Sequence, residues 1–291
     1  MKTRRPARIA AALAAFLWAA PTLAAADAQK PPQRIVSMNL CNDELLMRLV
    51  DPSRIASITN LSQEKVNEPV GLSDIAMKLK VNHGLAEEVL MAEPDLIVAG
   101  SFTTTTAVAL LRKLGYKVVT FDPENNLEDM RANVRKMGKL VGEEAKAEQI
   151  IAEFDAKLKA LQAQLPPGEQ PVFADIAVNN FIAGKDTFYA EVVNAGGWRT
   201  IGQALGYSGF RNVTLEELMK IHPDLISTQT PWTNPPSMST LALGHPALQR
   251  IVDETPNVVI PERFTTCGTP AVMGAIELLV AERKKLAERS R

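Results

Sequence analysis

Two stretches of this chain carry nearly the same pattern. Residues 85–97 read LAEEVLMAEPDLI, and residues 214–226 read TLEELMKIHPDLI. Pro94 and Pro223 are 129 positions apart, and the paired acids before them repeat at the same distance. Each stretch is typical of a short helix that ends at a proline and continues into a buried strand. We therefore interpret the chain as two halves that repeat one helix–proline–strand unit.

The acids of this repeat have two interpretations. Carboxylates in the first turn of a helix are favoured by the helix dipole by about 0.3–1 kcal/mol, and Thr214 and Glu217 also fit a capping box. Alternatively, Glu87 and Glu216 are exposed carboxylates, one in each half, that dock on a basic two-fold partner. Local spacing alone leaves both interpretations open.

Strand-like and helix-like segments alternate along most of the chain, which favours a parallel α/β architecture. The expected strands cover residues 34–38, 55–58, 94–98, 117–121, 171–178, 223–228 and 257–260. The expected helices cover residues 43–50, 84–92, 107–114, 127–140, 189–195, 215–221 and 269–289.

A longer helix is expected near the middle of the chain. One apolar stripe follows helical spacing there, and the helix ends at a Pro-Pro-Gly sequence; the stripe consists of Ile151, Phe154, Leu158, Leu161 and Leu165. We predict two Rossmann-like lobes with central parallel sheets, residues 33–142 and 170–291. One long rigid α-helix, residues 143–165, joins them.

The first 26 residues have the layout of a secretory signal peptide. A basic start precedes an apolar run, and small residues stand at the expected cleavage positions. The run is shorter than the roughly 20 residues that a membrane-spanning helix needs. We expect cleavage and a soluble mature protein in the periplasm. Without residues 1–26 the chain has a formal net charge of −5, which argues against nucleic-acid binding through a broad basic field.

Ligands of open parallel sheets bind at the loops that follow the carboxyl ends of the strands. These loops are residues 39–42, 59–63, 101–106, 122–126, 179–181, 228–234 and 263–268. The aromatic residues in them predict a partly apolar cleft wall, and Arg263 could meet a ligand carboxylate or phosphate. The candidate ligand-binding residues are Asn39, Cys41, Phe102, Phe181, Trp232, Arg263 and Phe264.

The two cysteines, Cys41 and Cys267, fall in loops of different lobes. A disulfide, free thiols and a soft metal site are the three interpretations, and an oxidising compartment favours the disulfide. A two-cysteine metal site lacks neighbouring histidines, since His83, His222 and His245 stand singly. We expect no metal site and no cofactor.

In their order along the chain, several motifs resemble the periplasmic binding proteins of ABC importers for vitamin B12, haem and ferric siderophores. They are the two Glu-Glu…Pro-Asp-Leu-Ile units, the opening RIVSMNL at residues 34–40, LGYKV at 114–118, the central helix, and FIAGK at 181–185. The resemblance covers residues 33–285. It implies a ligand cleft between two lobes, limited hinge motion, and Glu87 and Glu216 as the carboxylates that meet arginines of a dimeric permease. Glu88 and Glu217 are the alternative pair.

The resemblance implies that a monomer captures a metal chelate, such as a ferric siderophore, a corrinoid or haem, and delivers it to the permease. The family usually has Pro or Ser where this chain has Leu40-Cys41, and the aromatic content is only 5%, so the ligand stays open. A secreted α/β hydrolase or transferase is the alternative class. The sequence has no G-x-S-x-G elbow, G-x-G-x-x-G or Walker motif to support it. A third interpretation is a signalling protein that docks on a receptor.

Overall fold

Short strands supply the framework of the molecule. The computed structural model describes residues 30–65, 69, 71–175, 181–227 and 245–289, apart from the side chain of Leu215. The strands are β1 (Ile35–Ser37), β2 (Ile55–Thr59), β3 (Val81–Asn82), β4 (Leu96–Gly100), β5 (Val118–Phe121), β6 (Val172–Asp175), β7 (Phe181–Ala183), β8 (Arg199–Thr200), β9 (Phe210–Asn212), β10 (Leu225–Ser227) and β11 (Asn257–Val258).

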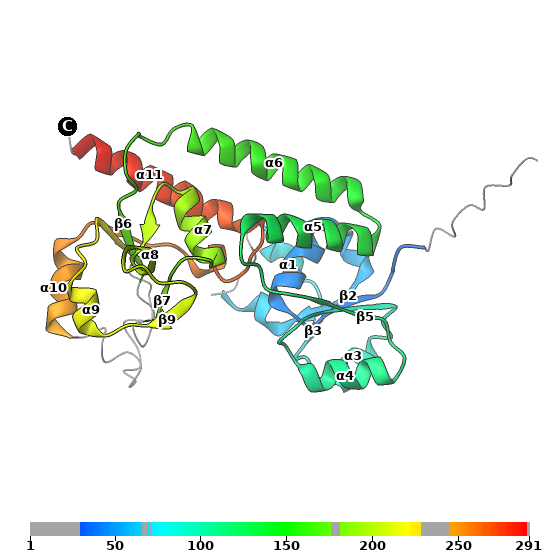
Figure 1. The fold of residues 1–291 in the computed structure, drawn as a ribbon. Coiled ribbons are helices and arrows are strands. Elements are labelled where there is room, and N and C mark those ends of the chain that lie inside the picture. Colours follow the sequence, from blue (N-terminus) through cyan, green and yellow to red (C-terminus); the bar gives the residue numbers. More distant parts are fainter. Residues whose placement is uncertain (1–29, 66–68, 70, 176–180, 228–244, 290–291) are drawn as a thin grey trace, which may run out of the picture. The chain divides into compact units, whose positions relative to one another are not determined.

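Helices connect these strands and cover them (Figure 1). The α-helices are α1 (Leu40–Leu49), α2 (Ser73–Ala76), α3 (Ala86–Met91), α4 (Thr105–Lys113), α5 (Leu127–Val141), α6 (Glu144–Gln162), α7 (Phe188–Ala195), α8 (Ile201–Ala204), α9 (Leu215–Met219), α10 (Pro246–Glu254) and α11 (Met273–Arg289). The 3-10 helices within the described residues are η1 (Pro52–Arg54), η2 (Asn60–Gln63), η6 (Glu262–Phe264) and η7 (Pro270–Val272).

The strands form two parallel sheets with the same topology. The first has the order β3-β2-β1-β4-β5 and the second the order β11-β10-β6-β8, while β7 and β9 pair separately as an antiparallel ribbon. In each sheet the chain moves from a central strand to one side and then to the other, so β1 corresponds to β6 and β4 to β10. This confirms the predicted α/β class with two parallel sheets.

The repeated aspartate has a structural role in both sheets. Asp95 accepts hydrogen bonds from the backbone N–H groups of Gln33 (2.6 Å) and Arg34 (3.0 Å), directly before β1. Asp224 accepts one from the backbone N–H of Val172 (2.8 Å), at the start of β6. In each case the carboxylate holds the first residues of two neighbouring strands together. The Pro-Asp-Leu-Ile motif therefore sets the register between the central strand and its neighbour.

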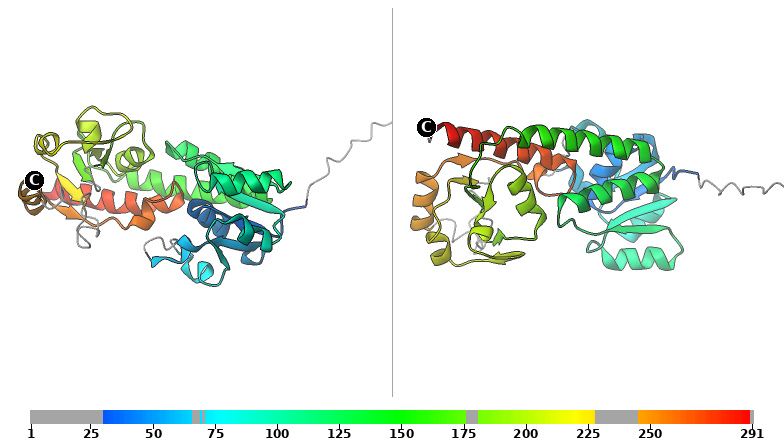
Figure 2. Two further views of the ribbon diagram at one scale, coloured as in Figure 1. Left: turned by 90° about the horizontal axis from the view of Figure 1, so that it is seen from below. Right: turned by 45° about the horizontal axis from the view of Figure 1, so that its top comes forward.

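The hairpin of α5 and α6 contributes to the cores beneath both sheets. Val134, Met137 and Val141 of α5 pack with Ile151 of α6 in the core of the first sheet. The opposite ends of the two helices pack in the core of the second sheet, together with α11; they contribute Leu127, Met130, Phe154 and Leu158. The apolar stripe predicted for the central helix is therefore divided between two cores. Two views show α6 and α11 side by side (Figure 2).

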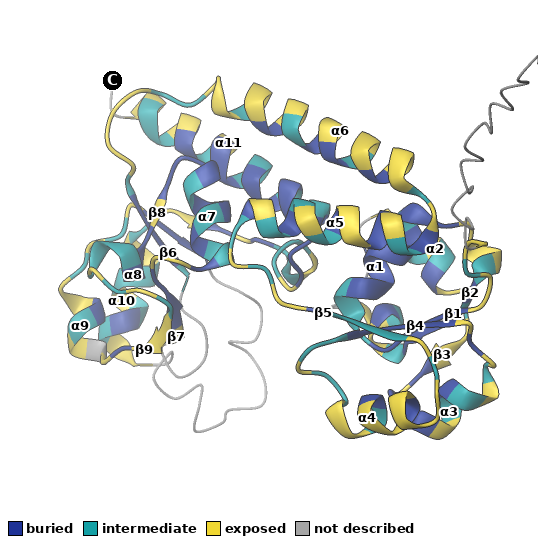
Figure 3. Cartoon of the chain, turned by 45° about the vertical axis from the view of Figure 1, so that its right-hand side comes forward, coloured by how far each residue is buried: buried dark blue, intermediate teal, exposed yellow. Residues whose placement is uncertain are grey.

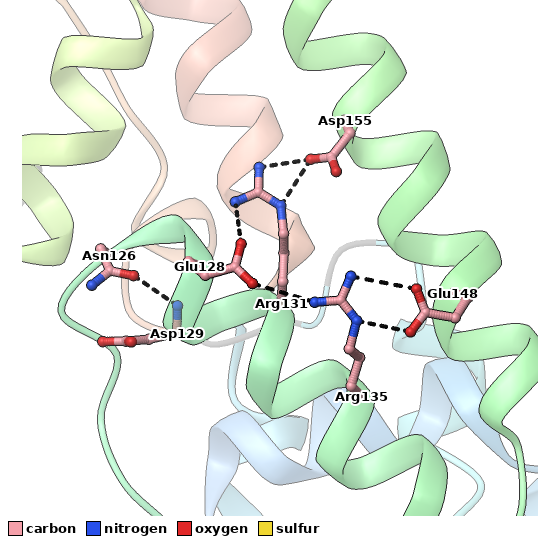
Figure 4. Close-up of polar contacts among 7 residues, drawn as sticks. All are labelled: Asn126, Glu128, Asp129, Arg131, Arg135, Glu148 and Asp155. Atoms are coloured by element: carbon pink, nitrogen blue, oxygen red, sulfur yellow. Dashed lines mark hydrogen bonds and ion pairs between the residues drawn. The ribbon is translucent and has the colours of Figure 1, made fainter.

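Ion pairs fix the two helices of the hairpin to each other (Figure 4). The Arg131 guanidinium donates through Nε (2.9 Å) and a terminal nitrogen (2.7 Å) to Oδ1 of Asp155. Nε of Arg135 lies 2.8 Å from Oε1 of Glu148. Gly142, in the left-handed region with φ +74°, makes the turn that reverses the chain between the helices.

Several short elements were not predicted from the sequence. They are β3, α2, α8, β8, α10 and the β7–β9 ribbon, and the predicted strand at 171–178 runs beyond the described residues after Asp175. Pro31–Arg291 forms one compact unit in which the two sheets share the α5–α6 hairpin, and the lobe boundaries at 33–142, 143–165 and 170–291 stay a prediction. Within the described ranges, no helix combines the length and apolar character needed to cross a membrane.

Candidate functional site

The second acid of each repeat is held by hydrogen bonds inside its own lobe. The carboxylate of Glu88 accepts from the backbone N–H of His83 (2.5 Å) and lies 3.0 Å from Nδ1 of the same residue. The carboxylate of Glu217 accepts from the backbone N–H of Thr214 (2.7 Å) and from the Tyr207 hydroxyl (2.5 Å). These hydrogen bonds lower the pKa of both carboxyl groups, and the backbone N–H of His83 and the Tyr207 hydroxyl are the respective main causes.

The first acid of each repeat lies in the first turn of its helix and is exposed to solvent. Glu87 is the second residue of α3, and Glu216 is the second residue of α9, whose side chain is 82% exposed. A Thr214–Glu217 capping box starts α9, whereas the start of α3 has no side-chain cap. The two repeats therefore use the second carboxylate to shape the helix start and direct the first one outward.

The carboxyl ends of β1 and β4 bring two of the predicted cleft loops together. The chain departs from these two strands in opposite directions, which is where open parallel sheets bind ligands. Asn39 caps α1 by accepting hydrogen bonds from the backbone N–H groups of Cys41 (3.1 Å) and Asn42 (3.2 Å). Its Nδ2 donates to Oγ1 of Thr103, at 3.4 Å. The polar atoms of Asn39 thus position the loop after β1 against the loop after β4.

The predicted aromatic residues have different surroundings. Phe102, in the loop after β4, is 81% exposed. Phe181 on β7 stacks on Phe210 of β9, with ring centroids 5.4 Å apart, and both rings are exposed. Phe264 instead packs against the core of the second sheet, with the Arg263 guanidinium 5.4 Å from its ring centroid. Trp232 lies outside the described residues. Of the predicted aromatic residues that the structure describes, Phe102 and Phe181 are therefore the exposed ones.

A disulfide joins the two halves at the start of α1. The sulfur atoms of Cys41 and Cys267 are bonded, and the Cα atoms are 5.2 Å apart. One turn further along α1, Oε2 of the buried Glu44 accepts a hydrogen bond from the Thr269 hydroxyl (2.8 Å). Because both contacts join α1 to the segment before α11, they restrict movement of one sheet against the other.

A polar pocket lies between the loop after β5 and the start of α7. Its volume is about 510 Å³, which is the size of a small-molecule site, and residues from both halves line it. They are Asn125, Asn126, Lys185, Asp186, Thr187, Ala190, Glu191, Asn194 and Gln203. The sequence predicted the loop at residues 122–126 as part of a cleft, but Lys185 and the α7 face were missed. Thr187, Ala190, Glu191 and Asn194 follow helical spacing, which could have indicated this face.

Asp43, in the first turn of α1, is a fully buried carboxyl group. Its Oδ2 accepts from the backbone N–H of Thr59 (3.0 Å) and the Ser62 hydroxyl (2.7 Å), whereas its Oδ1 has no partner among the described residues. Burial raises the pKa of Asp43 to about 7, although the hydrogen bonds from its neighbours act in the opposite direction. The group is thus close to its titration point at neutral pH. Across the described parts of the chain, no three His, Cys, Asp or Glu side chains are grouped to hold a metal ion.

A family model described as periplasmic binding protein matches residues 35–251. An uncharacterised ABC transporter substrate-binding lipoprotein of Bacillus subtilis is 24% identical over 209 residues, which are 69% of this chain and 64% of that protein. A cobalamin-binding protein of Halobacterium salinarum is 22% identical over 206 residues, which are 68% of this chain and 54% of that protein. The chain thus spans less than two thirds of the length of either relative.

A solved structure, that of the periplasmic haem-binding protein RhuT from Roseiflexus in its apo form, has the same fold. It superposes with a TM-score of 0.70 at 15% sequence identity. The match covers 88% of this chain and 99% of the other. At this identity the likeness establishes the fold alone.

Reduction of the disulfide is expected to destabilise the fold, because the link closes a loop across 226 residues and limits the unfolded ensemble. The loss of unfolding free energy should be about 2–4 kcal/mol in urea titrations with and without reductant. A double variant, Cys41→Ser with Cys267→Ser, should no longer respond to reductant. Two titratable thiols in the untreated protein, with no shift of its midpoint, would contradict the disulfide.

Asp43 should make the fold less stable as pH rises. Below about pH 4 the carboxyl group is protonated in both states; between about pH 4 and 7 it ionises only in the unfolded chain, which favours unfolding. The quantity to measure is the unfolding free energy of the wild-type protein minus that of Asp43→Asn. This difference should fall by about 4 kcal/mol from pH 4 to 8. The exposed Asp51, whose pKa the Ser53 hydroxyl lowers, is the matched control. Asp51→Asn should show no such fall, and a pH-independent difference for Asp43→Asn would overturn this explanation.

Proposed function

The chain belongs to the periplasmic binding protein family, and from this we propose that it is the solute-binding protein of an ABC importer. It captures a ligand between its lobes, residues 33–142 and 170–291, and hands it to a permease in the inner membrane. The substrate-binding lipoprotein among its relatives supports the importer role. The observation that carries the proposal furthest is the pair of equivalent helices α3 and α9, each with one outward carboxylate.

Docking through Glu87 and Glu216 agrees with the roles of the four repeated acids. Glu88 and Glu217 already accept hydrogen bonds that shape their own lobes, so a partner would compete with those bonds. Glu87 and Glu216 are exposed, and neither holds the backbone of its own lobe, so a basic group can pair with them without breaking those hydrogen bonds. Complementary charges of this kind speed association and fix the orientation of the complex. The partner in this proposal is a dimeric permease that presents one basic group to each lobe, and the binding protein is a monomer.

The proposed ligand is a metal chelate: a ferric siderophore, a corrinoid or haem. The names of the cobalamin-binding relative and the haem-binding structure support this class. In this proposal the exposed rings of Phe102 and Phe181 contact the apolar part of the chelate. Asn125, Asn126 and Lys185 supply polar contacts from the pocket of about 510 Å³. Asn39, Cys41, Arg263 and Phe264 support the surrounding loops, and Trp232 stays a candidate contact.

We place the protein in the periplasm, after removal of residues 1–26. The basic and apolar order of that segment supports export. The Cys41–Cys267 disulfide supports an oxidising compartment, since such bonds are rare among cytosolic proteins.

Native mass spectrometry of protein purified from its own periplasm should detect a bound chelate at a ratio of one to one. Haemin, vitamin B12 and a ferric hydroxamate siderophore are the probes for titration of the stripped protein. One of the three should bind with a Kd between micromolar and nanomolar, which corresponds to about −8 to −12 kcal/mol. A bound peptide or sugar, with no affinity for any of the probes, would refute the ligand class.

Charge reversal at both outward carboxylates should abolish uptake and leave ligand binding intact. The double variant is Glu87→Arg with Glu216→Arg, and uptake into cells is compared with probe binding to the purified protein. The matched control, Glu144→Arg with Glu169→Arg, changes two exposed acids outside α3 and α9 by the same charge. Normal uptake by the first variant would end the docking proposal, whereas equal losses in both variants would reveal a general charge effect.

A further inference from the structure

The two outward carboxylates have different neighbours. In the register of the repeat, Met91 in the first lobe corresponds to Lys220 in the second, and Glu93 corresponds to His222. Residues 85–93 therefore carry three carboxylates and no basic residue, while residues 214–222 carry two carboxylates, a lysine and a histidine. We call these segments the α3 surface and the α9 surface.

Lys220 already pairs with the outward carboxylate of the α9 surface. Its Nζ lies 3.1 Å from Oε1 of Glu216, one helical turn away. The position one turn after Glu87 holds Met91 instead, and Glu87 forms no ion pair within the described residues. A basic group of a partner therefore meets a free carboxylate on α3 and a partly neutralised one on α9. The helices packed beside them carry charges of their own: α4 has Arg112 and Lys113, and α10 has Arg250, Asp253 and Glu254. The difference therefore lies in the Glu216–Lys220 ion pair itself and not in the net charge around each helix.

The α3 surface also exposes more apolar area. Met91 is 77% exposed and Leu85 is 55% exposed, and they flank Glu87 in the sequence. Leu110 of the adjacent α4 and Leu114 directly after it are 43% and 53% exposed. Figure 3 shows α3 and α4 side by side with outward faces coloured as exposed. On α9 and α10, Met219 is the one exposed large apolar side chain among those the structure describes, and it is 39% exposed.

We infer that the two docking surfaces are unequal, with the α3 surface contributing most of the affinity for the partner. The partner subunit that faces α3 would present a basic side chain beside apolar groups that cover Met91 and Leu85. The subunit that faces α9 meets a carboxylate that Lys220 competes for, so this contact orients the complex and adds little affinity. This inference rests on the proposed docking function and states how much of the docking affinity each surface contributes.

The physical reason is the combination of charge and desolvation. Exposed ion pairs are weak because water and salt screen them. An apolar rim excludes water from such a pair, and this strengthens it when the partner binds. Exposed Met91 lies one helical turn after Glu87, whereas Lys220, one turn after Glu216, is a competing cation.

The test measures docking of the full-length mature protein on right-side-out inner-membrane vesicles from the cells that carry the gene. Removing single charges should separate the two surfaces: Glu87→Gln should weaken binding about tenfold and Glu216→Gln only about twofold. Exchange of the equivalent neighbours gives the matched pair. Lys220→Met should tighten binding about twofold to threefold, and Met91→Lys should weaken it about fivefold. Far-UV circular dichroism and thermal midpoints establish that each variant is folded.

The double exchange, Met91→Lys with Lys220→Met, gives the decisive comparison. In this background Glu216→Gln should cost more affinity than Glu87→Gln, the reverse of the order in the wild-type protein. If Glu87→Gln and Glu216→Gln weaken docking equally in the wild-type background, the two surfaces are not unequal, even where the charge-reversed variant (Glu87→Arg with Glu216→Arg) fails to dock. Normal docking by this charge-reversed variant would instead overturn the proposed function itself.

Discussion

The apolar contact between the α5–α6 hairpin and both cores is the constraint on which the rest of the structure depends. Each helix places one end in the core of the first sheet and the other end in the core of the second. The Arg131–Asp155 ion pair holds the two helices together at the hairpin. Movement of one sheet against the other would have to separate apolar side chains that are buried together. The Cys41–Cys267 disulfide and the Glu44–Thr269 hydrogen bond add to this limit from the side of α1.

In the proposed docking, this rigidity determines how the two repeated helices can meet a partner. If the two carboxylates stood on separate flexible domains, they could meet a dimeric partner in many geometries. Binding would then lose conformational entropy, because it would fix one of these geometries. Held by a shared hairpin, α3 and α9 present Glu87 and Glu216 in one arrangement, so recognition can depend on their spacing. Glu88 and Glu217, the second acids of the repeats, contribute to this fixed arrangement. Their hydrogen bonds hold the backbone that carries Glu87 and Glu216. The different residues at the equivalent positions Met91 and Lys220 make the two surfaces chemically different.

Long and regular helices and strands could be predicted from the sequence, whereas most of the shortest ones could not. The buried strands and the long helices α5, α6 and α11 have strong periodic patterns, and they were predicted within a few residues. The two-residue strands β3 and β8 have too few side chains to show a period. Pro246 at the start of α10, followed by Leu248, Ile251 and Val252, is a helix signal of the kind that could have predicted this helix. The polar pocket was harder to predict, because its lining comes from three separate stretches of the chain, residues 125–126, residues 185–194 and Gln203.

The sequence by itself determined the α/β class, the repeated helix–proline–strand unit and the positions of its acids. Each of these follows from local periodicity or from a string of residues that occurs twice. Only the tertiary structure decided which acid of each pair points outward, since this depends on the hydrogen bonds of His83 and Tyr207. It also decided that the apolar stripe of α6 serves two cores, and that Lys185 and the α7 face share a pocket with the loop after β5. These features arise from contacts between residues far apart in the chain, and no local pattern specifies which distant residues will meet.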